Sequence, residues 1–259
     1  MPVSQKDKAE RFQALHRGPG IFVIPNPWDI GSARILASMG FKALATTSAG
    51  FAWSRGLRDG AVGFEAMIQH CRDMVAATDL PVSADLEKGK GNSPDSAAET
   101  VFAAEAAGLA GCSLEDHTGD PADPIYAFDH AVERIAAAAE AARALKRDFV
   151  LTARCENFLW GRPNADDTIR RLQAFEQAGA DVLFAPGLTD LAIIRDVCAA
   201  LTRPVNVLAG SPHFTVAALA EAGVRRISLG PRLSNHAFAA IERASRGILE
   251  RGTFDFCGD

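Results

Sequence analysis

The feature that most restricts the fold is a repeated passage from a helix-forming segment, through a glycine, into a short apolar run. Glycine is common just after a helix C-terminus, and an apolar run of this length is typical of a buried parallel strand. The pattern therefore predicts strands that each follow a helix closely. The glycines at these four junctions are Gly40, Gly108, Gly179 and Gly223.

Strand and helix patterns alternate along the chain. Strands are predicted at residues 21–25, 43–47, 81–87, 112–115, 148–154, 182–185, 204–208 and 227–230. Helices are predicted at about 30–38, 64–77, 96–106, 131–145, 165–177, 190–200, 215–221 and 235–250. No G-x-G-x-x-G follows the first strand, so an open dinucleotide-binding sheet is not favoured. We expect an α/β fold, a (β/α)8 TIM-type barrel that forms a single domain over residues 1–259 with a C-terminal helical segment.

Composition narrows the classes of function. The net charge is −5 with both signs interspersed, so no basic stripe indicates nucleic acid as a partner. The first 13 residues lack the apolar core of a secretory signal, and no apolar run approaches a membrane span. We expect a cytoplasmic protein without membrane contact. The odd number of scattered cysteines indicates reduced thiols rather than disulfides or a zinc site, at Cys71, Cys112, Cys155, Cys198 and Cys257.

One segment predicts a metal site. Asp85 and Glu87 end the third predicted strand, where residues two apart share a face, and Gly89 and Gly91 follow. Two carboxylates on one buried face resist desolvation and repel each other, and a divalent cation relieves both costs. Oxygen ligands favour Mg²⁺ or Mn²⁺ over zinc. An exposed acidic edge strand is the alternative interpretation.

Function in a barrel lies at the C-terminal ends of the strands, and polar residues gather at those positions here. The strand interiors are almost purely apolar, so these polar groups indicate a ligand rather than packing. They are Asn26, Asp29, Thr47, Ser48, Asp85, Glu87, Glu115, Asp116, His117, Arg154, Glu156, Asn206 and Arg232.

The fifth predicted strand carries Arg154. The two-residue period places Thr152, Arg154 and Glu156 on one face and Cys155 on the other. Arg154 is then a candidate clamp for an anion, or the partner of Glu156 or Glu115 in a structural ion pair. Both roles can hold at once.

Taken together, these motifs are similar to those of the isocitrate lyase and phosphoenolpyruvate mutase superfamily. The resemblance covers nearly the whole chain in the correct order. It rests on Asn26-Pro27-Trp28-Asp29, Thr47-Ser48-Ala49-Gly50, Asp59-Gly60, Asp85-Leu86-Glu87-x-Gly89-x-Gly91, Ala107-Gly108-x-x-Gly111, Glu115-Asp116 and Ala153-Arg154.

The resemblance implies a barrel whose last helix is exchanged between subunits, usually in a dimer of dimers. It implies Asp85 as the carboxylate nearest Mg²⁺, with Glu87, Glu115 and Asp59 holding the ion mostly through water. It also implies cleavage or formation of a C–C or P–C bond beside a 2-oxo acid, through an enolate held by the metal. The predicted substrate-binding residues are Thr47, Ser48, Ala49, Gly50, Arg154 and Asn206, and the predicted catalytic residues are Arg154, Glu115 and His117.

The chain departs from the family at the loop after Glu115. The lyases carry a catalytic cysteine there in a Lys-x-Cys-Gly-His motif, whereas residues 115–126 hold neither cysteine nor lysine. The usual Gly-Tyr-Gly is Gly89-Lys90-Gly91, and the mutases' Asn-rich loop is absent. His117, Tyr126 or water would then handle the proton, while His213 is a weaker candidate.

Three functions are compatible with these residues. The first is Mg²⁺-dependent cleavage of a C–C bond in a small 2-oxo or 2-hydroxy dicarboxylate, of which oxaloacetate is an example. The second is P–C chemistry on phosphonopyruvate or phosphoenolpyruvate, which would need more cations than Lys90 and Arg162 supply beside Arg154. The third is a metabolite-binding barrel without catalysis.

Overall fold

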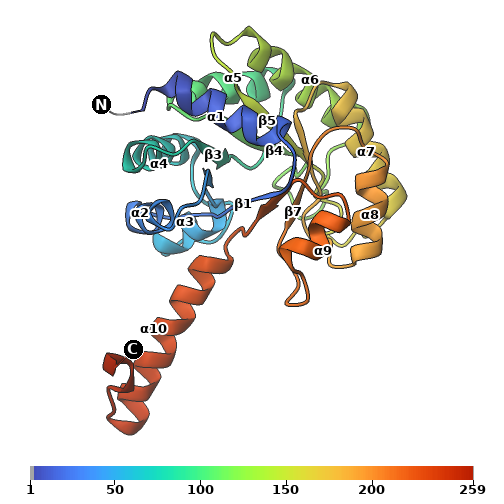
Figure 1. Ribbon diagram of the computed structural model, residues 1–259. Coiled ribbons are helices and arrows are strands. Elements are labelled where there is room, and N and C mark those ends of the chain that lie inside the picture. The colour runs from blue at the N-terminus through green and yellow to red at the C-terminus, as the bar shows by residue number, and fades with distance from the viewer. Residues whose placement is uncertain (1–2, 259) are drawn as a thin grey trace.

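The computed structural model describes residues 3–258 and contains one sheet of eight parallel strands surrounded by helices (Figure 1). The expected (β/α)8 TIM-type barrel is confirmed. Seven of the neighbouring strand pairs are joined in order, and a backbone hydrogen bond from Ala45 N to Pro25 O, 3.1 Å, links the remaining two edges. The strands are β1 (Phe22–Ile24), β2 (Leu44–Ala45), β3 (Val82–Asp85), β4 (Gly111–Glu115), β5 (Val150–Arg154), β6 (Val182–Phe184), β7 (Val205–Leu208) and β8 (Arg226–Ser228).

The helices include all eight that the sequence predicts and two more. They are α1 (Gln5–Arg17), α2 (Ile30–Ser38), α3 (Ser48–Ser54), α4 (Phe64–Ala77), α5 (Pro94–Ala106), α6 (Phe128–Ala144), α7 (Ala165–Gln177), α8 (Leu191–Ala199), α9 (Val216–Glu221) and α10 (Arg232–Arg251), and a 3-10 turn η1 (Asp255–Gly258) follows. Helices α1 and α3 were not predicted from the sequence. No helix within residues 3–258 is both long and apolar enough to cross a bilayer.

Helix α1 closes the N-terminal end of the barrel. Ser4 caps it by accepting a hydrogen bond from Asp7 N, and Phe12 is fully buried at its centre. Phe12 belongs to an apolar cluster with residues at or next to the starts of several strands, among them Ala43, Val150 and Val182. Because the plug is apolar, a ligand must enter from the opposite end, where the strands terminate.

His16, also on α1, lies beneath the barrel interior. Its Nδ1 is 2.8 Å from Phe12 O and its Nε2 is 3.2 Å from Arg226 NH1. An arginine can only donate, so Nε2 accepts and the proton lies on Nδ1 of a neutral ring. Burial, followed by the nearby Arg226 cation, lowers the pKa of His16 from 6.5 to about 3.

We predict that His16 makes the fold sensitive to acid. Below pH 6.5 the unfolded chain protonates this ring while the folded chain does not until about pH 3, so stability is lost as the pH falls. Between pH 7 and 4.5 the wild type should lose about 3 kcal/mol more than His16→Gln. Urea unfolding at both pH values measures this difference. His236→Gln, at an exposed position, is the control and should keep the wild-type pH slope.

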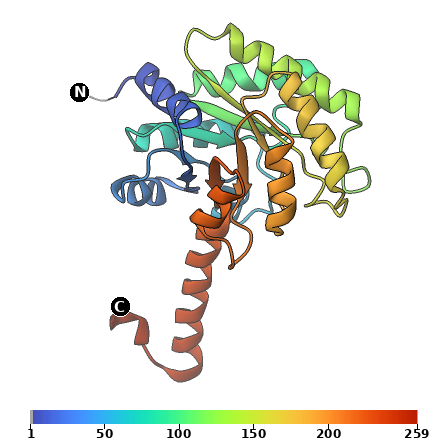
Figure 2. The same ribbon diagram turned by 45° about the vertical axis from the view of Figure 1, so that its right-hand side comes forward.

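Helix α10 leaves the barrel and extends away from it, and the 3-10 turn η1 contacts it (Figures 1 and 2). Only Ser234 and Gly247 on this helix are buried, whereas Ile241 is 62% exposed and Leu249 is 85% exposed. An isolated amphipathic helix with its apolar side in water is unfavourable. Exchange of this helix with a second copy of the chain would bury that surface and stays a proposal.

We predict that the protein is an oligomer in solution, because α10 otherwise leaves large apolar side chains in water, and the family resemblance implies a tetramer of exchanged dimers. Light scattering at micromolar concentration should give a multiple of the 27.5 kDa chain mass. Ile241→Glu should shift the mass downward, and the neighbouring Glu242→Lys should not. A wild-type monomer would contradict the prediction.

Candidate active site

A cavity of about 260 Å³ opens at the C-terminal ends of the strands and descends between them. This is the end of the barrel at which the sequence predicts function. Its walls come from all parts of the chain, which shows that the fold assembles it. The polar residues that line it are Asn26, Thr46, Thr47, Ser48, Asp59, Ser83, Asp85, Ser113, Arg154, Asn206, Arg226 and Ser228.

Arg154, at the end of β5, is the centre of an ionic cluster. NH1 donates to Asp85 Oδ1 at 2.6 Å, NH2 lies 3.0 Å from Glu115 Oε2, and Nε donates to Glu156 Oε1 at 3.0 Å. The Arg154 side chain is 12% exposed, so these ion pairs are largely shielded from water. The surrounding carboxylates raise the pKa of Arg154 well above its ordinary value against the opposing effect of burial. The structural ion pair that the sequence suggested is therefore present, with all three partners at once.

Neighbouring carboxylates repel one another in this cluster. Burial, followed by Asp85 and Asp59, raises the pKa of Glu87 from 4.5 to about 7. Burial, followed by Asp85, raises the pKa of Asp59 as well, and burial raises that of Glu115 well above 4.5 although Arg154 opposes it. The cluster therefore holds more negative charge than one arginine neutralises, and a further cation would relieve it.

Strand β3 ends at Asp85, two residues earlier than expected. Glu87 has φ of 53°, in the left-handed region, so it does not continue the strand. Its backbone oxygen still accepts a hydrogen bond from Glu115 N at 3.1 Å, which fixes the turn against β4. Glu87 still lies close enough to Asp85 for its pKa to be affected, although it does not line the cavity, and a turn rather than the two-residue strand period places it there.

The predicted carboxylate-binding residues form the start of α3. Thr47 caps this helix by accepting from Gly50 N at 3.2 Å, and Ser48 Oγ donates to Asp85 Oδ2 at 2.9 Å. Thr47, Ser48 and Ala49 line the cavity, while Gly50 lies behind them. A Cβ at Gly50 would stand 2.7 Å from Thr47 Cγ2, so a side chain there would push the helix away.

The oxygen donors fit a hydrated Mg²⁺. Within residues 3–258 no three His, Cys, Asp or Glu side chains are already placed to coordinate one metal ion. Mg²⁺ usually keeps several of its waters and is held by one or two carboxylates, which matches a site with Asp85 in front and Asp59, Glu87 and Glu115 around it. The mutual repulsion of those carboxylates is the observation that supports a cation there.

The loop after β4 holds its candidate proton donors away from the cavity. His117 Nδ1 donates to Pro124 O at 2.6 Å, and its ring stacks on Trp160 with centroids 3.9 Å apart. Tyr126 is buried, and its hydroxyl donates to Asn92 Oδ1 at 2.8 Å. His213 is exposed. None of these three side chains lines the cavity.

Two arginines in this region were not predicted from the sequence. Arg171 donates to one oxygen of Asp116 at 3.2 Å, and the backbone N–H of Glu156 donates to the other at 2.8 Å, so two strand-end residues that the sequence did identify are joined through Asp116. Arg226 was missed because the eighth strand was taken to begin at Ile227. The two-residue period of a strand could have revealed it, because Ile227 faces the apolar core and its neighbours Arg226 and Ser228 must then face the barrel interior.

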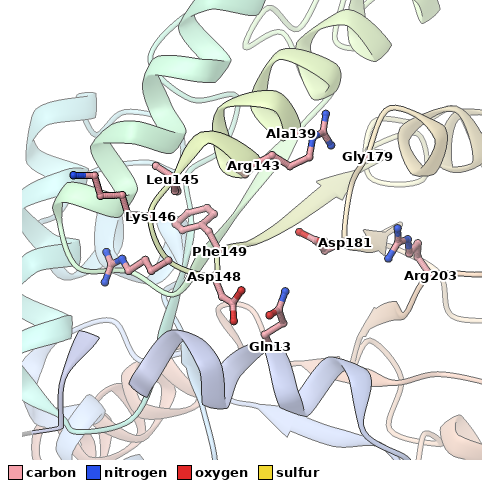
Figure 3. Close-up of a pocket in the computed structure, with 12 residues that line it drawn as sticks. Gln13, Ala139, Arg143, Leu145, Lys146, Asp148, Phe149, Gly179, Asp181 and Arg203 are labelled. Atoms are coloured by element: carbon pink, nitrogen blue, oxygen red, sulfur yellow. The ribbon is translucent and has the colours of Figure 1, made fainter. Parts of the chain in front are cut away.

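A second hollow, of about 400 Å³, lies at the opposite end of the barrel (Figure 3). Arg143, Asp181 and Arg203 surround it, and Gln13 of α1 borders it. Asp181 accepts a hydrogen bond from Leu151 N at 2.9 Å, which ties the starts of β5 and β6 together. This second hollow contains none of the predicted site residues. It lies at the N-terminal end of the strands, where barrel residues contribute to stability rather than to catalysis.

Comparisons with known proteins identify an enzyme of the C–C lyase or mutase type. Residues 12–249 match the family model described as phosphoenolpyruvate phosphomutase. The match spans most of the chain, so the chain belongs to this family, within the isocitrate lyase and phosphoenolpyruvate mutase superfamily that its sequence resembles.

Several relatives support this assignment. An oxaloacetate decarboxylase from Bradyrhizobium diazoefficiens is 33% identical and covers 80% of this chain and 73% of its own. A crystal structure from Burkholderia cenocepacia, classified only as a lyase/mutase, is 53% identical, with a TM-score of 0.97 over 98% of this chain and 92% of that one. An oxaloacetate acetylhydrolase in complex with oxalate is 28% identical, with a TM-score of 0.87 over 95% and 88%. Members of the superfamily cleave C–C or P–C bonds.

Proposed function

We propose that the protein is a Mg²⁺-dependent carbon–carbon lyase that acts on a small 2-oxo dicarboxylate of the oxaloacetate type. The observation that carries the proposal is the excess of carboxylate around Asp85 in a cavity sized for a small acid. The relatives that decarboxylate or hydrolyse oxaloacetate favour the same substrate class.

The proposed division of roles follows from the contacts. Asp85 would hold Mg²⁺, with Asp59, Glu87 and Glu115 acting through water, and the bound ion would polarise the 2-oxo group and stabilise negative charge that develops there. Ser48 and Ala49 would receive the substrate carboxylate at the start of α3. Arg154 fixes Asp85 and Glu115 in place through its ion pairs.

The missing loop cysteine restricts the reaction. Cleavage of isocitrate or methylisocitrate requires an acid that protonates the departing succinate carbanion, and residues 115–126 offer no cysteine for this step. Loss of CO₂, hydrolysis or retro-aldol cleavage does not require such an acid from the protein, and water would supply the proton, because His117 does not line the cavity. General acid catalysis is worth about 10²–10⁴ in rate, so isocitrate should react near background.

The two further cations that the sequence offered for P–C chemistry, Lys90 and Arg162, lie outside the cavity. Lys90 pairs with Glu99 at 2.6 Å and Arg162 lies 3.7 Å from Asp123, with all four side chains largely exposed. Neither cation lines the cavity, so neither is placed to receive a phosphonate. A barrel that only binds metabolites would have no use for so costly a charge cluster.

A substrate panel tests the proposal. Oxaloacetate, malate-type acids, isocitrate, methylisocitrate and phosphonopyruvate are each incubated with Mg²⁺, and pyruvate and phosphate release are followed. The expected result is fastest turnover of an oxaloacetate-type acid. If isocitrate or methylisocitrate were the best substrate, another residue would replace the missing cysteine, and phosphate release would assign the protein to P–C chemistry.

A further inference from the structure

Arg226 stands at the floor of the candidate active-site cavity, inside the barrel. It opens β8, is 5% exposed and lines the cavity from below. Nε donates to Asn206 Oδ1 at 2.8 Å, NH2 donates to Thr152 Oγ1 at 3.0 Å, and NH1 lies 3.2 Å from His16 Nε2. Barrel interiors are normally filled by branched apolar side chains, so a guanidinium here requires an explanation.

All three partners of Arg226 are neutral. An amide, a hydroxyl and an uncharged imidazole accept from it, and no carboxylate within residues 3–258 forms an ion pair with it. A guanidinium has five N–H bonds, so two remain without an acceptor in this part of the chain. Burying a charge without a counter-charge is costly. The fold therefore maintains an uncompensated cation next to a cavity.

Arg154 and Arg226 line the same cavity but differ in the charge of their partners. Arg154 is surrounded by Asp85, Glu115 and Glu156, so its charge is more than neutralised. It therefore has little net charge to offer an anionic ligand. Of the two, Arg226 is the cation that still lacks an anion.

We propose that Arg226 binds a carboxylate of the substrate at the cavity floor, which makes the site selective for short dicarboxylates. The proposal rests on the proposed function for the identity of the reaction. One carboxylate lies at the start of α3, near Ser48 and Ala49, and the second reaches the two remaining N–H bonds of Arg226. The cavity of about 260 Å³ lies just below the usual range of roughly 300–1,000 Å³ for larger ligands, which suits a small acid.

The neighbours of Arg226 act as positioning residues. Asn206 accepts from Arg226 through Oδ1 and donates through Nδ2 to Ser228 Oγ at 2.9 Å, so its amide has one fixed orientation. Thr152 and His16 hold the two other nitrogens. With three of its N–H bonds held, the guanidinium cannot turn toward solvent and presents the other two in a fixed direction.

The test measures binding of malonate, a short dicarboxylate, and of acetate by calorimetry, with and without Mg²⁺. Charge-assisted hydrogen bonds predict that Arg226→Gln weakens malonate binding about 10- to 100-fold and leaves acetate nearly unchanged. Arg226→Lys, which keeps the charge, should recover part of the loss. Arg225→Gln is the matched control, because Arg225 carries the same charge one residue earlier but donates to Gly18 O outside the cavity. Equal malonate affinity in wild type and Arg226→Gln would overturn the proposal.

A second variant keeps the test decisive if Arg226→Gln does not fold. Asn206→Asp places a carboxylate at the Oδ1 position that Arg226 already contacts, so it supplies an internal counter-charge. It should raise the melting temperature and weaken malonate binding by more than Asn206→Ala does. A stabilised Asn206→Asp that binds malonate as the wild type does would assign Arg226 a purely structural role. Failure of every acid in the substrate panel would reject the reaction, while malonate binding through Arg226 would still be measurable.

Discussion

Asp85→Ala is expected to abolish Mg²⁺ binding and, with it, turnover. Changes to residues that merely support a metal ligand typically cost 10- to 100-fold in affinity or activity, so loss of the foremost carboxylate should cost more than about 100-fold. Calorimetric titration of wild type and Asp85→Ala with Mg²⁺ measures the affinity directly, and turnover of the best panel substrate measures the activity.

The fold should survive this substitution. Arg154 loses one partner but keeps Glu115 and Glu156, so no charge is left buried alone. Removing Asp85 also removes repulsion from Asp59 and Glu87. Asp123→Ala, which deletes an exposed carboxylate in the loop after β4, is the matched control and should bind Mg²⁺ normally. Undiminished Mg²⁺ affinity in Asp85→Ala would remove Asp85 from the proposed metal site.

Arg154→Met is expected to produce the largest loss of stability. It leaves Asp85, Glu115 and Glu156 without their shared cation, and breaking a buried ion pair from one side costs about 3–5 kcal/mol. Urea unfolding of wild type and variant gives the difference in free energy of unfolding. Activity should be lost as well, because the carboxylates lose the contacts that fix their positions.

The loss should depend on pH in a definite direction. Without Arg154, the pKa of Glu115, which burial already raises, moves further above the unfolded value. A carboxyl group whose pKa is higher in the folded than in the unfolded state binds its proton more tightly in the folded state, so the free energy of unfolding rises as the pH falls. Arg154→Met should therefore be more destabilised at pH 8.5 than at pH 6. Arg154→Lys should recover part of the stability. A loss that did not change with pH would mean that the carboxylates are not titrating in the variant.

The sequence by itself predicted the barrel because glycine-terminated helices followed by short apolar runs are local patterns. Helices α2, α4 and α7 have the predicted bounds, since amphipathic spacing and capping residues act within a few positions of one another. The same short-range patterns predicted that Asp85, Glu115 and Arg154 lie at the ends of strands. Helix α1 was missed because its role, plugging the barrel through Phe12, depends on strands far along the chain.

Only the tertiary structure decided which of these charges meet. Strand periodicity put Arg154 and Glu156 on one face. The closed barrel also brings Asp85 from β3 and Glu115 from β4 to Arg154, so its guanidinium has three carboxylate partners. Local patterns also could not show that Glu87 reaches the site through a left-handed turn, or that His117 is held by Pro124 and Trp160. The uncompensated charge of Arg226 emerges only when His16, Thr152 and Asn206 converge on it from distant parts of the chain, because a residue's electrostatic environment is set by its neighbours in space.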